Sequence, residues 1–200
     1  SDLKGVTSAE GVTAHAYLRW LQTQGDSPPR ELMIDGDPGW LIAHSELHHR
    51  RAPGNTCLAA LRAMRQLGQA ARNNSKGCGG VMRVAPAGLF TATLAARDTE
   101  SSSARAFELG EGLAALTHGH PTGRLAAGVF AALVCSLVAG AGLREAVDDA
   151  TTLLVQRRDH EETLSAITSA VALADSSTPH AEAVAELGQG WVADEALAIA

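Results

Sequence analysis

The feature that most constrains the fold is a long stretch without a charged residue, Leu125–Leu143. It is made largely of alanine and glycine, so its hydrophobicity is modest for a segment that crosses a bilayer. A helix that is apolar on all sides but only modestly hydrophobic is typical of the centre of a helical core. We therefore expect a buried central helix, and membrane insertion is the less favoured alternative.

The composition of the whole chain favours helices around that segment. Among its 200 residues, apolar types make up 46% and charged types 19%, which is typical of a globular protein. Alanine and leucine, both strong helix formers, supply most of the apolar bulk, and runs of β-branched residues are few. No linker or internal repeat divides the chain. We therefore predict an all-α fold, a single compact multi-helix domain over residues 1–200.

Charge and cysteine content narrow the classes of function. The net charge is −6 and only two lysines occur, Lys4 and Lys76, so the chain lacks the basic clusters of a general nucleic-acid binder. The three cysteines are odd in number and fit no CxxC spacing. That pattern suits a reducing compartment better than a disulfide framework. We expect a cytoplasmic protein without a membrane or general nucleic-acid partner.

Apolar periodicity, caps and breakers predict where the helices lie. Pro121 suits the first turn of the central helix, where a missing N–H group costs nothing. The last segment is helical in pattern but has no stop signal, and the chain does not begin with Met, so we expect a domain truncated at both ends. The expected helical segments are Val12–Gln24 with a cap at Ser8, Trp40–His49, a helix from a cap at Asn55 or Thr56 to Leu67, Val81–Ala96 interrupted by Pro86, a helix capped within Ser101–Ser103 that ends at Leu116, Pro121–Gly140, Leu143–Val155, Glu162–Leu173, His180–Leu187 and Trp191–Ala200.

The stretch Asn74–Arg83 is the most informative candidate site. Three of its four central residues are glycines, which lets backbone N–H groups point together and approach a ligand closely. Ser75, Lys76 and Arg83 flank these glycines with side-chain donors. Such a loop suits a phosphate or pyrophosphate, although it matches neither the GxxxxGK[ST] nor the GxGxxG pattern. Taken alone, the same residues could equally form a tight structural turn.

Two other segments have features of ligand sites. Gly54 precedes Asn55 and Thr56 at the start of an expected helix, whose exposed N-terminus would suit an anion. The alternative is an ordinary helix cap. His118 and His120 lie at the junction before the central helix, where they could bind an anion or hydrogen-bond a ribose. The alternative there is a role in capping and packing.

Taken in order, these segments resemble the ADP-ribosylglycohydrolase family. The ordered set is more specific than any one motif, and it spans most of Gly11–Ala200. Membership implies an all-α fold and hydrolysis of the glycosidic bond between ADP-ribose and a protein side chain or small acceptor, assisted by two Mg²⁺ or Mn²⁺ ions. The points of resemblance are Arg51–Thr56 leading into Ala59-Ala60-Leu61, Asn74–Arg83 running into Val84-Ala85-Pro86, Leu116-Thr117-His118, and Gly190–Leu197.

The resemblance implies roles for particular residues. Ser75 and Gly77 fall where the family's loop holds the diphosphate of ADP-ribose. His118 falls where a histidine contacts the ligand near the ribose and phosphate, and Gly54 lies near the same pocket. Cys78 departs from the pattern, because the family often has Asn near this position. The predicted substrate-binding residues are Gly54, Ser75, Lys76, Gly77 and His118.

The acidic residues that would make such a site catalytic are missing from the sequence. The family draws its metal ligands from an N-terminal Thr-Asp-Asp-Thr-like motif and a C-terminal Asp-x-Asp-Ser/Thr motif, and neither is present. Asp35-Gly36-Asp37 has the Asp-x-Asp spacing of the C-terminal motif. It lies in the wrong part of the family's order of motifs, however, and lacks the Ser or Thr that should follow. We therefore assign no catalytic residue and no metal ligand, and expect this chain alone to be inactive. The alternatives to an enzyme fragment are an inactive relative that binds ADP-ribose or a nucleotide, and a purely structural helical domain.

Overall fold

The computed structural model describes residues 8–33, 39–94 and 102–200, and these residues are all-α, as predicted. Within them the only strand-like feature is an isolated bridge between Gly77 and Val192. Four short 3-10 turns connect the longer elements of the described residues: η1 (Arg30–Leu32), η2 (Trp40–Ala43), η3 (Ser45–Leu47) and η4 (Val81–Arg83). The α-helices of the described residues are α1 (Ala9–Thr23), α2 (Asn55–Ala63), α3 (Ala85–Leu94), α4 (Ser102–Ala115), α5 (Pro121–Val138), α6 (Leu143–Leu154), α7 (Glu161–Ala174), α8 (His180–Glu186) and α9 (Ala193–Ile199).

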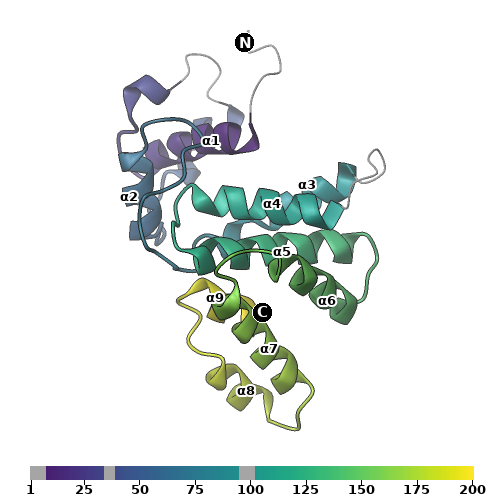
Figure 1. Cartoon of the computed structure of the whole chain (residues 1–200). Coiled ribbons are helices and arrows are strands. Elements are labelled where there is room, and N and C mark those ends of the chain that lie inside the picture. The colour runs from purple at the N-terminus through teal and green to yellow at the C-terminus, as the bar shows by residue number, and fades with distance from the viewer. Residues whose placement is uncertain (1–7, 34–38, 95–101) are drawn as a thin grey trace.

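Helix α5 lies at the centre of the fold, as the uncharged stretch predicts (Figure 1). Helices α3, α4, α6, α7 and α9 all pack on it. Helix α3 approaches α5 so closely that a Cβ atom at Gly88 would lie 2.4 Å from the carbonyl oxygen of Ala131, and α4 approaches it almost as closely at Gly110. By length and composition α5 could cross a membrane, but 61% of that span is buried inside the fold. Its burial is that of a core helix.

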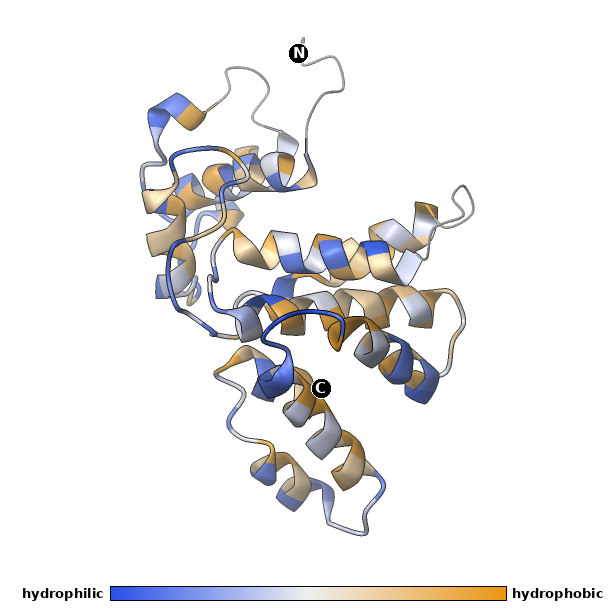
Figure 2. Cartoon of the chain, in the orientation of Figure 1, coloured by the Kyte–Doolittle hydropathy of each residue, from blue (hydrophilic) through white to orange (hydrophobic). Residues whose placement is uncertain are grey.

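The helices around α5 are amphipathic. Helix α6 buries Ala146, Ala150 and Leu154, which recur at helical spacing on one face. Figure 2 shows the hydrophilic colouring of its outer part beside the more apolar α5. Helices α1 and α2 form a second cluster at one end of α4, where Leu18 and Leu61 are buried. The glycine-rich loop runs between this end of the molecule and α9.

Several helix ends agree with the sequence signals. The N–H group of Gly11 donates to Oγ of Ser8 at 3.0 Å, so Ser8 caps α1 as predicted. Pro121 occupies the first position of α5, also as predicted. His120 is the N-cap of α5, and its Nδ1 accepts from the N–H group of Thr122 at 3.2 Å.

Three helix predictions were wrong in extent. Trp40–His49 is not a helix but two 3-10 turns, η2 (Trp40–Ala43) and η3 (Ser45–Leu47). Helix α2 ends at Ala63 rather than Leu67, because Met64 turns to an extended backbone while its side chain is buried in the cluster with α1.

The third difference is at Val81–Ala96. This segment begins as a 3-10 turn, η4 (Val81–Arg83), and α3 starts only at Ala85. Pro86 has no N–H group and fits only the first turn of a helix, so the helix cannot run through it from Val81. The predicted end at Ala96 lies outside the described residues, and so does Ser101, the first residue of the predicted cap Ser101–Ser103. Ser102 and Ser103 are already part of α4.

Candidate functional site

The glycine-rich loop is fixed to the segment that precedes α9. The N–H group of Cys78 donates to the carbonyl of Trp191 at 3.0 Å, and the N–H group of Ala193 donates to the carbonyl of Lys76 at 2.8 Å. Between these two bonds, Gly77 and Val192 form the antiparallel bridge. The backbone of the loop is therefore held in one position by a segment distant in sequence.

Asn73 ties the start of the loop to the turn before α5. Its Oδ1 accepts from the N–H groups of Ser75 at 3.1 Å and Gly119 at 2.9 Å, and its Nδ2 donates to the carbonyl of Thr117 at 2.9 Å. The N–H group of His120 adds a bond to the carbonyl of Ser75 at 3.3 Å. Sequence reasoning missed Asn73, although an Asn before a glycine-rich loop is a typical turn residue.

Ser75 joins the loop to the start of α2. Its Oγ lies 3.2 Å from Oγ1 of Thr56, and it accepts a long bond from the N–H group of Gly77 at 3.4 Å. The N-cap of α2 is Gly54, with φ +80° and no side chain to cap the helix, so the predicted cap at Asn55 or Thr56 was wrong: Asn55 is already the first residue of the helix. Because the first N–H groups of a helix have no partner within it, the start of α2 is suited to an anion. The structure thus brings Gly54, Ser75 and Gly77 to one place.

His118 lies directly beneath the loop and is only 1% exposed. A Cβ atom at Gly79 would be 3.2 Å from Cε1 of His118, and one at Gly77 would be 3.6 Å from its Nε2. The loop can pass this close to the ring because these positions are glycines. His118 therefore supports the loop from below, and its Nε2 lies on the loop side.

The protonation of His118 follows from its neighbours. Nη2 of Arg83 donates to Oγ1 of Thr117 at 2.5 Å, and that hydroxyl lies 2.8 Å from Nδ1 of His118 and 3.5 Å from the carbonyl oxygen of Ala114. Burial first, and the charge of Arg83 second, lower the pKa of His118 to about 4. The ring is therefore neutral at pH 7.

Arg83 does not offer its guanidinium to a ligand, as the sequence suggested, but uses it inside the fold. Nε donates to the Tyr17 hydroxyl at 2.9 Å, Nη1 to the carbonyl of Gly79 at 2.5 Å, and Nη2 to the carbonyl of Leu113 at 3.3 Å. The guanidinium also lies 5.0 Å from the centre of the Tyr17 ring. Arg83 thus fastens the end of the loop to α1 and α4.

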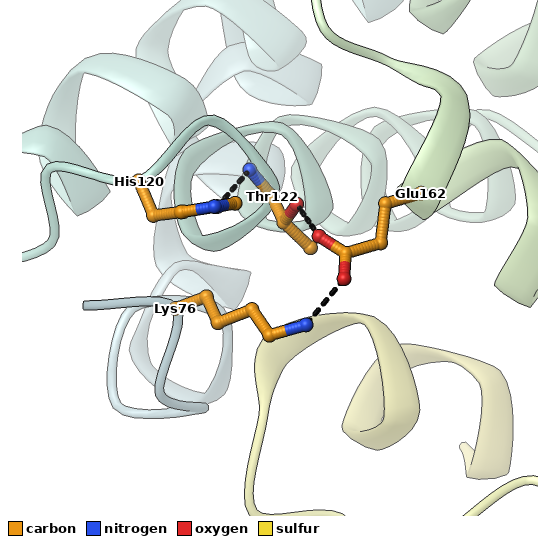
Figure 3. Close-up of polar contacts among 4 residues, drawn as sticks. All are labelled: Lys76, His120, Thr122 and Glu162. Atoms are coloured by element: carbon orange, nitrogen blue, oxygen red, sulfur yellow. Dashed lines mark hydrogen bonds and ion pairs between the residues drawn. The ribbon is translucent and has the colours of Figure 1, made fainter. Parts of the chain in front are cut away.

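Lys76 extends from the loop toward α7. Figure 3 shows its ammonium paired with Glu162, whose other carboxylate oxygen accepts from the Thr122 hydroxyl at the start of α5. Hydrogen bonds from Lys76 and then Thr122 hold the pKa of Glu162 below its ordinary value. The same pair raises the pKa of Lys76, and the charges of Asp194 and Glu195 add to that rise. The prediction that Lys76 contacts substrate stays a prediction.

A metal centre does not fit the part of the chain that the structure describes. There, no three His, Cys, Asp or Glu side chains gather closely enough to hold a metal ion. The Asp35-Gly36-Asp37 segment lies outside the described residues.

The fold and the site define an all-helical protein with a backbone loop and a helix N-terminus suited to an anion. The family model of the ADP-ribosylglycohydrolases matches residues 3–200, nearly the whole chain. The chain therefore belongs to the ADP-ribosylglycohydrolase family, and the predicted resemblance is confirmed. Hydrolysis of ADP-ribose linkages, with use of divalent metal ions, is the chemistry of this family. No curated protein and no solved structure matches the chain.

Proposed function

We propose that this chain forms the ADP-ribose-binding part of a hydrolase that releases ADP-ribose from a modified side chain or a small acceptor. The observation that carries the proposal is the convergence of three kinds of donor at one place. These are the Ser75 hydroxyl with the Gly77 N–H group, which is engaged only by a long bond of 3.4 Å, the uncapped start of α2 after Gly54, and the ring of the neutral His118. All three suit a diphosphate.

The loop is prepared for a ligand before the ligand arrives. Its backbone is held by Trp191 and Ala193 on one side and by Asn73 on the other. Donors that are already in place cost little ordering entropy on binding, so each contributes more to affinity than a mobile side chain would. Ser75 adds a hydroxyl group beside the N–H group of Gly77. We propose that the diphosphate accepts hydrogen bonds from these groups.

Lys76 has a secondary place in this proposal. Its charge is largely balanced by Glu162, and its ammonium is already hydrogen-bonded. We therefore assign the main phosphate contacts to the backbone and expect from Lys76 a weaker, long-range attraction. Its side chain is 35% exposed, so solvent screens that attraction further.

Hydrolysis needs groups that this part of the chain does not bring together. Since the described residues do not fit a metal centre, we propose that the 200-residue chain alone binds ADP-ribose without turning it over. The same observation supports a second candidate function, an inactive relative that only binds ADP-ribose. The two candidates are separated by assaying the protein as it occurs in its organism for release of ADP-ribose from ADP-ribosyl-arginine and ADP-ribosyl-serine, with Mg²⁺ or Mn²⁺ added. Turnover supports the hydrolase, and turnover by the 200-residue chain itself would contradict its proposed inactivity.

Binding is tested by calorimetry of the chain with ADP-ribose, pyrophosphate and adenosine. We expect ADP-ribose to bind most tightly, pyrophosphate to bind measurably, and adenosine to bind much more weakly, because it has no phosphate for the loop. Absence of binding by both ADP-ribose and pyrophosphate would contradict the proposal and favour a purely structural domain.

A further inference from the structure

Tyr17 of α1 is joined to the end of the glycine-rich loop through one side chain, that of Arg83. Its hydroxyl oxygen accepts from Nε of Arg83 at 2.9 Å, although the two residues are 66 positions apart in the sequence. The guanidinium also lies over the Tyr17 ring, 5.0 Å from its centre. Tyr17 is not among the donors that we assign to the diphosphate, so it can act on that site only through Arg83.

The guanidinium of Arg83 links three parts of the fold. While Nε is held by Tyr17, Nη1 donates to the carbonyl of Gly79 at 2.5 Å and Nη2 donates to Oγ1 of Thr117 at 2.5 Å. A guanidinium is planar and rigid, so an acceptor that fixes Nε also sets the directions of both Nη groups. The Gly79 carbonyl belongs to the loop, and Oγ1 of Thr117 lies 2.8 Å from Nδ1 of His118. The Tyr17 hydroxyl therefore helps to set the loop and the histidine relative to each other.

We propose that Tyr17 is a positioning residue for the ligand site: its hydroxyl fixes the Arg83 guanidinium, which in turn holds the loop and His118 in place for the diphosphate. This inference rests on the proposed function. A loop that is ordered before the ligand arrives loses less conformational entropy on binding. Without the Tyr17 hydroxyl, Nε of Arg83 loses its acceptor, and the guanidinium shifts toward water to recover one. Part of the binding free energy must then go into ordering the loop.

Tyr17→Phe tests the proposal, because it removes the hydroxyl group and keeps the ring beneath Arg83. We expect this variant to bind ADP-ribose and pyrophosphate more weakly by the same factor, about fivefold in calorimetry, since both ligands use the loop. Arg83→Lys keeps the positive charge but has one nitrogen in place of three, so it cannot reach the Tyr17 hydroxyl, the Gly79 carbonyl and the Thr117 hydroxyl together. Its affinity for both ligands should fall at least as far.

The titration of His118 is a second readout, which a purely structural role of Tyr17 would leave unchanged. The charge of Arg83 contributes to the low pKa of His118, so a guanidinium that moves away should let this pKa rise. NMR titration measures it, with the ring signal identified by its loss in His118→Gln. Cys57 of α2, whose Sγ lies against Gly79 as the ring does, is the same in all these proteins.

Thr23→Val is the matched control, because it removes a hydroxyl from the same helix whose bonds, with Trp20 and Gln24, stay at the end of α1. It should change neither the two affinities nor the pKa of His118. The inference is overturned if Tyr17→Phe binds both ligands as tightly as the unaltered chain. It is also overturned if Tyr17→Phe weakens only one ligand, or weakens both while the pKa of His118 stays the same. An unaltered chain that binds neither ligand would refute the proposed function itself, whereas equal binding by the unaltered chain and Tyr17→Phe refutes only the role of Tyr17.

Discussion

Gly119 and Asn73 lie so close together that a side chain at position 119 is excluded. A Cβ atom there would be 2.0 Å from the Asn73 carbonyl oxygen, while the Gly119 N–H group donates to Oδ1 of the same Asn73 at 2.9 Å. This contact joins the start of the glycine-rich loop to the turn that carries His118. The position of the loop and the position of the buried histidine are therefore set by one packing arrangement.

Gly119→Ala should destabilise the protein strongly. The new methyl group would meet backbone oxygen, which cannot move aside as a flexible side chain could, so the turn or the loop must shift. We expect a loss of at least about 2 kcal/mol in the free energy of unfolding, measured by urea denaturation. Gly142→Ala is the control, since Gly142 has φ −70° and open space around its Cβ position. Equal stability of the two variants would contradict the close contact.

Gly77→Ala should have the opposite profile, with near-normal stability and impaired binding. Its Cβ atom would lie 3.6 Å from both Oγ of Ser75 and Nε2 of His118, which are ordinary contact distances. The methyl group would, however, occupy the space between the donors that we assign to the diphosphate. We expect ADP-ribose affinity to fall at least tenfold in calorimetry, with an unfolding free energy within about 0.5 kcal/mol of the unaltered chain. Unchanged affinity would remove Gly77 from the proposed site.

The fold was predictable from the sequence because its main signals are local. The uncharged stretch of α5, the cap at Ser8 and the proline at the start of α5 each act within one helix, and each prediction was confirmed. The helix expected at Trp40–His49 failed because short apolar runs do not distinguish an α-helix from successive 3-10 turns. Where α2 ends depends on the burial of Met64 against α1, which is a tertiary effect.

The site was predictable only in part. The glycines and His118 were recognised as candidates, and the structure places them together. The roles of Asn73 and Arg83 were not predictable, because their partners are distant in sequence: Asn73 bonds Thr117 and Gly119, and Arg83 bonds Tyr17. The direction of a long side chain likewise depends on the elements around it.

Lys76 and Glu162 form an ion pair whose contribution to stability we expect to be small. Their side chains are 35% and 43% exposed, so solvent screens the attraction. In a double-mutant cycle with Lys76→Met and Glu162→Gln, the coupling free energy should be about 0.5–1 kcal/mol. Glu161→Gln, at the neighbouring exposed position of α7, is the matched control and should show no coupling to Lys76. A coupling above about 2 kcal/mol would mean that the pair is far less hydrated than its exposure indicates.

The same two residues test how the ligand is held. If the backbone makes the main phosphate contacts, Lys76→Met should weaken ADP-ribose binding by no more than about threefold, in keeping with a screened long-range attraction. Glu162→Gln removes the negative charge beside Lys76, on a side chain that is 43% exposed. The affinity for ADP-ribose should therefore stay equal or rise slightly. Calorimetry at low and moderate salt checks both expectations. A loss of a hundredfold in Lys76→Met would show that its ammonium contacts the phosphates directly.

The neutral, buried His118 makes a specific prediction about stability at low pH. Its pKa in the folded protein is about 4, compared with an ordinary value of 6.5, because the ring is buried and faces the charge of Arg83. Between these two values the unfolded chain binds more protons than the folded one, so stability falls as the pH falls from about 6.5 toward 4. His118→Gln removes this group. From pH 7 to pH 4.5, we expect the unaltered chain to lose about 2–3 kcal/mol more unfolding free energy than this variant.

Urea denaturation of both proteins at a series of pH values gives this difference directly. Acidic residues such as Glu162, whose pKa is lowered in the folded state, also reduce stability as the pH falls. That contribution is common to the two proteins and cancels in the comparison, whatever stability His118→Gln loses at pH 7 through altered packing. If the plots of unfolding free energy against pH are parallel for the two proteins, the His118 ring can take up a proton within the folded protein, and the loop does not keep it neutral. Curves that converge toward pH 4 are the result expected from a ring held neutral beneath Gly77 and Gly79.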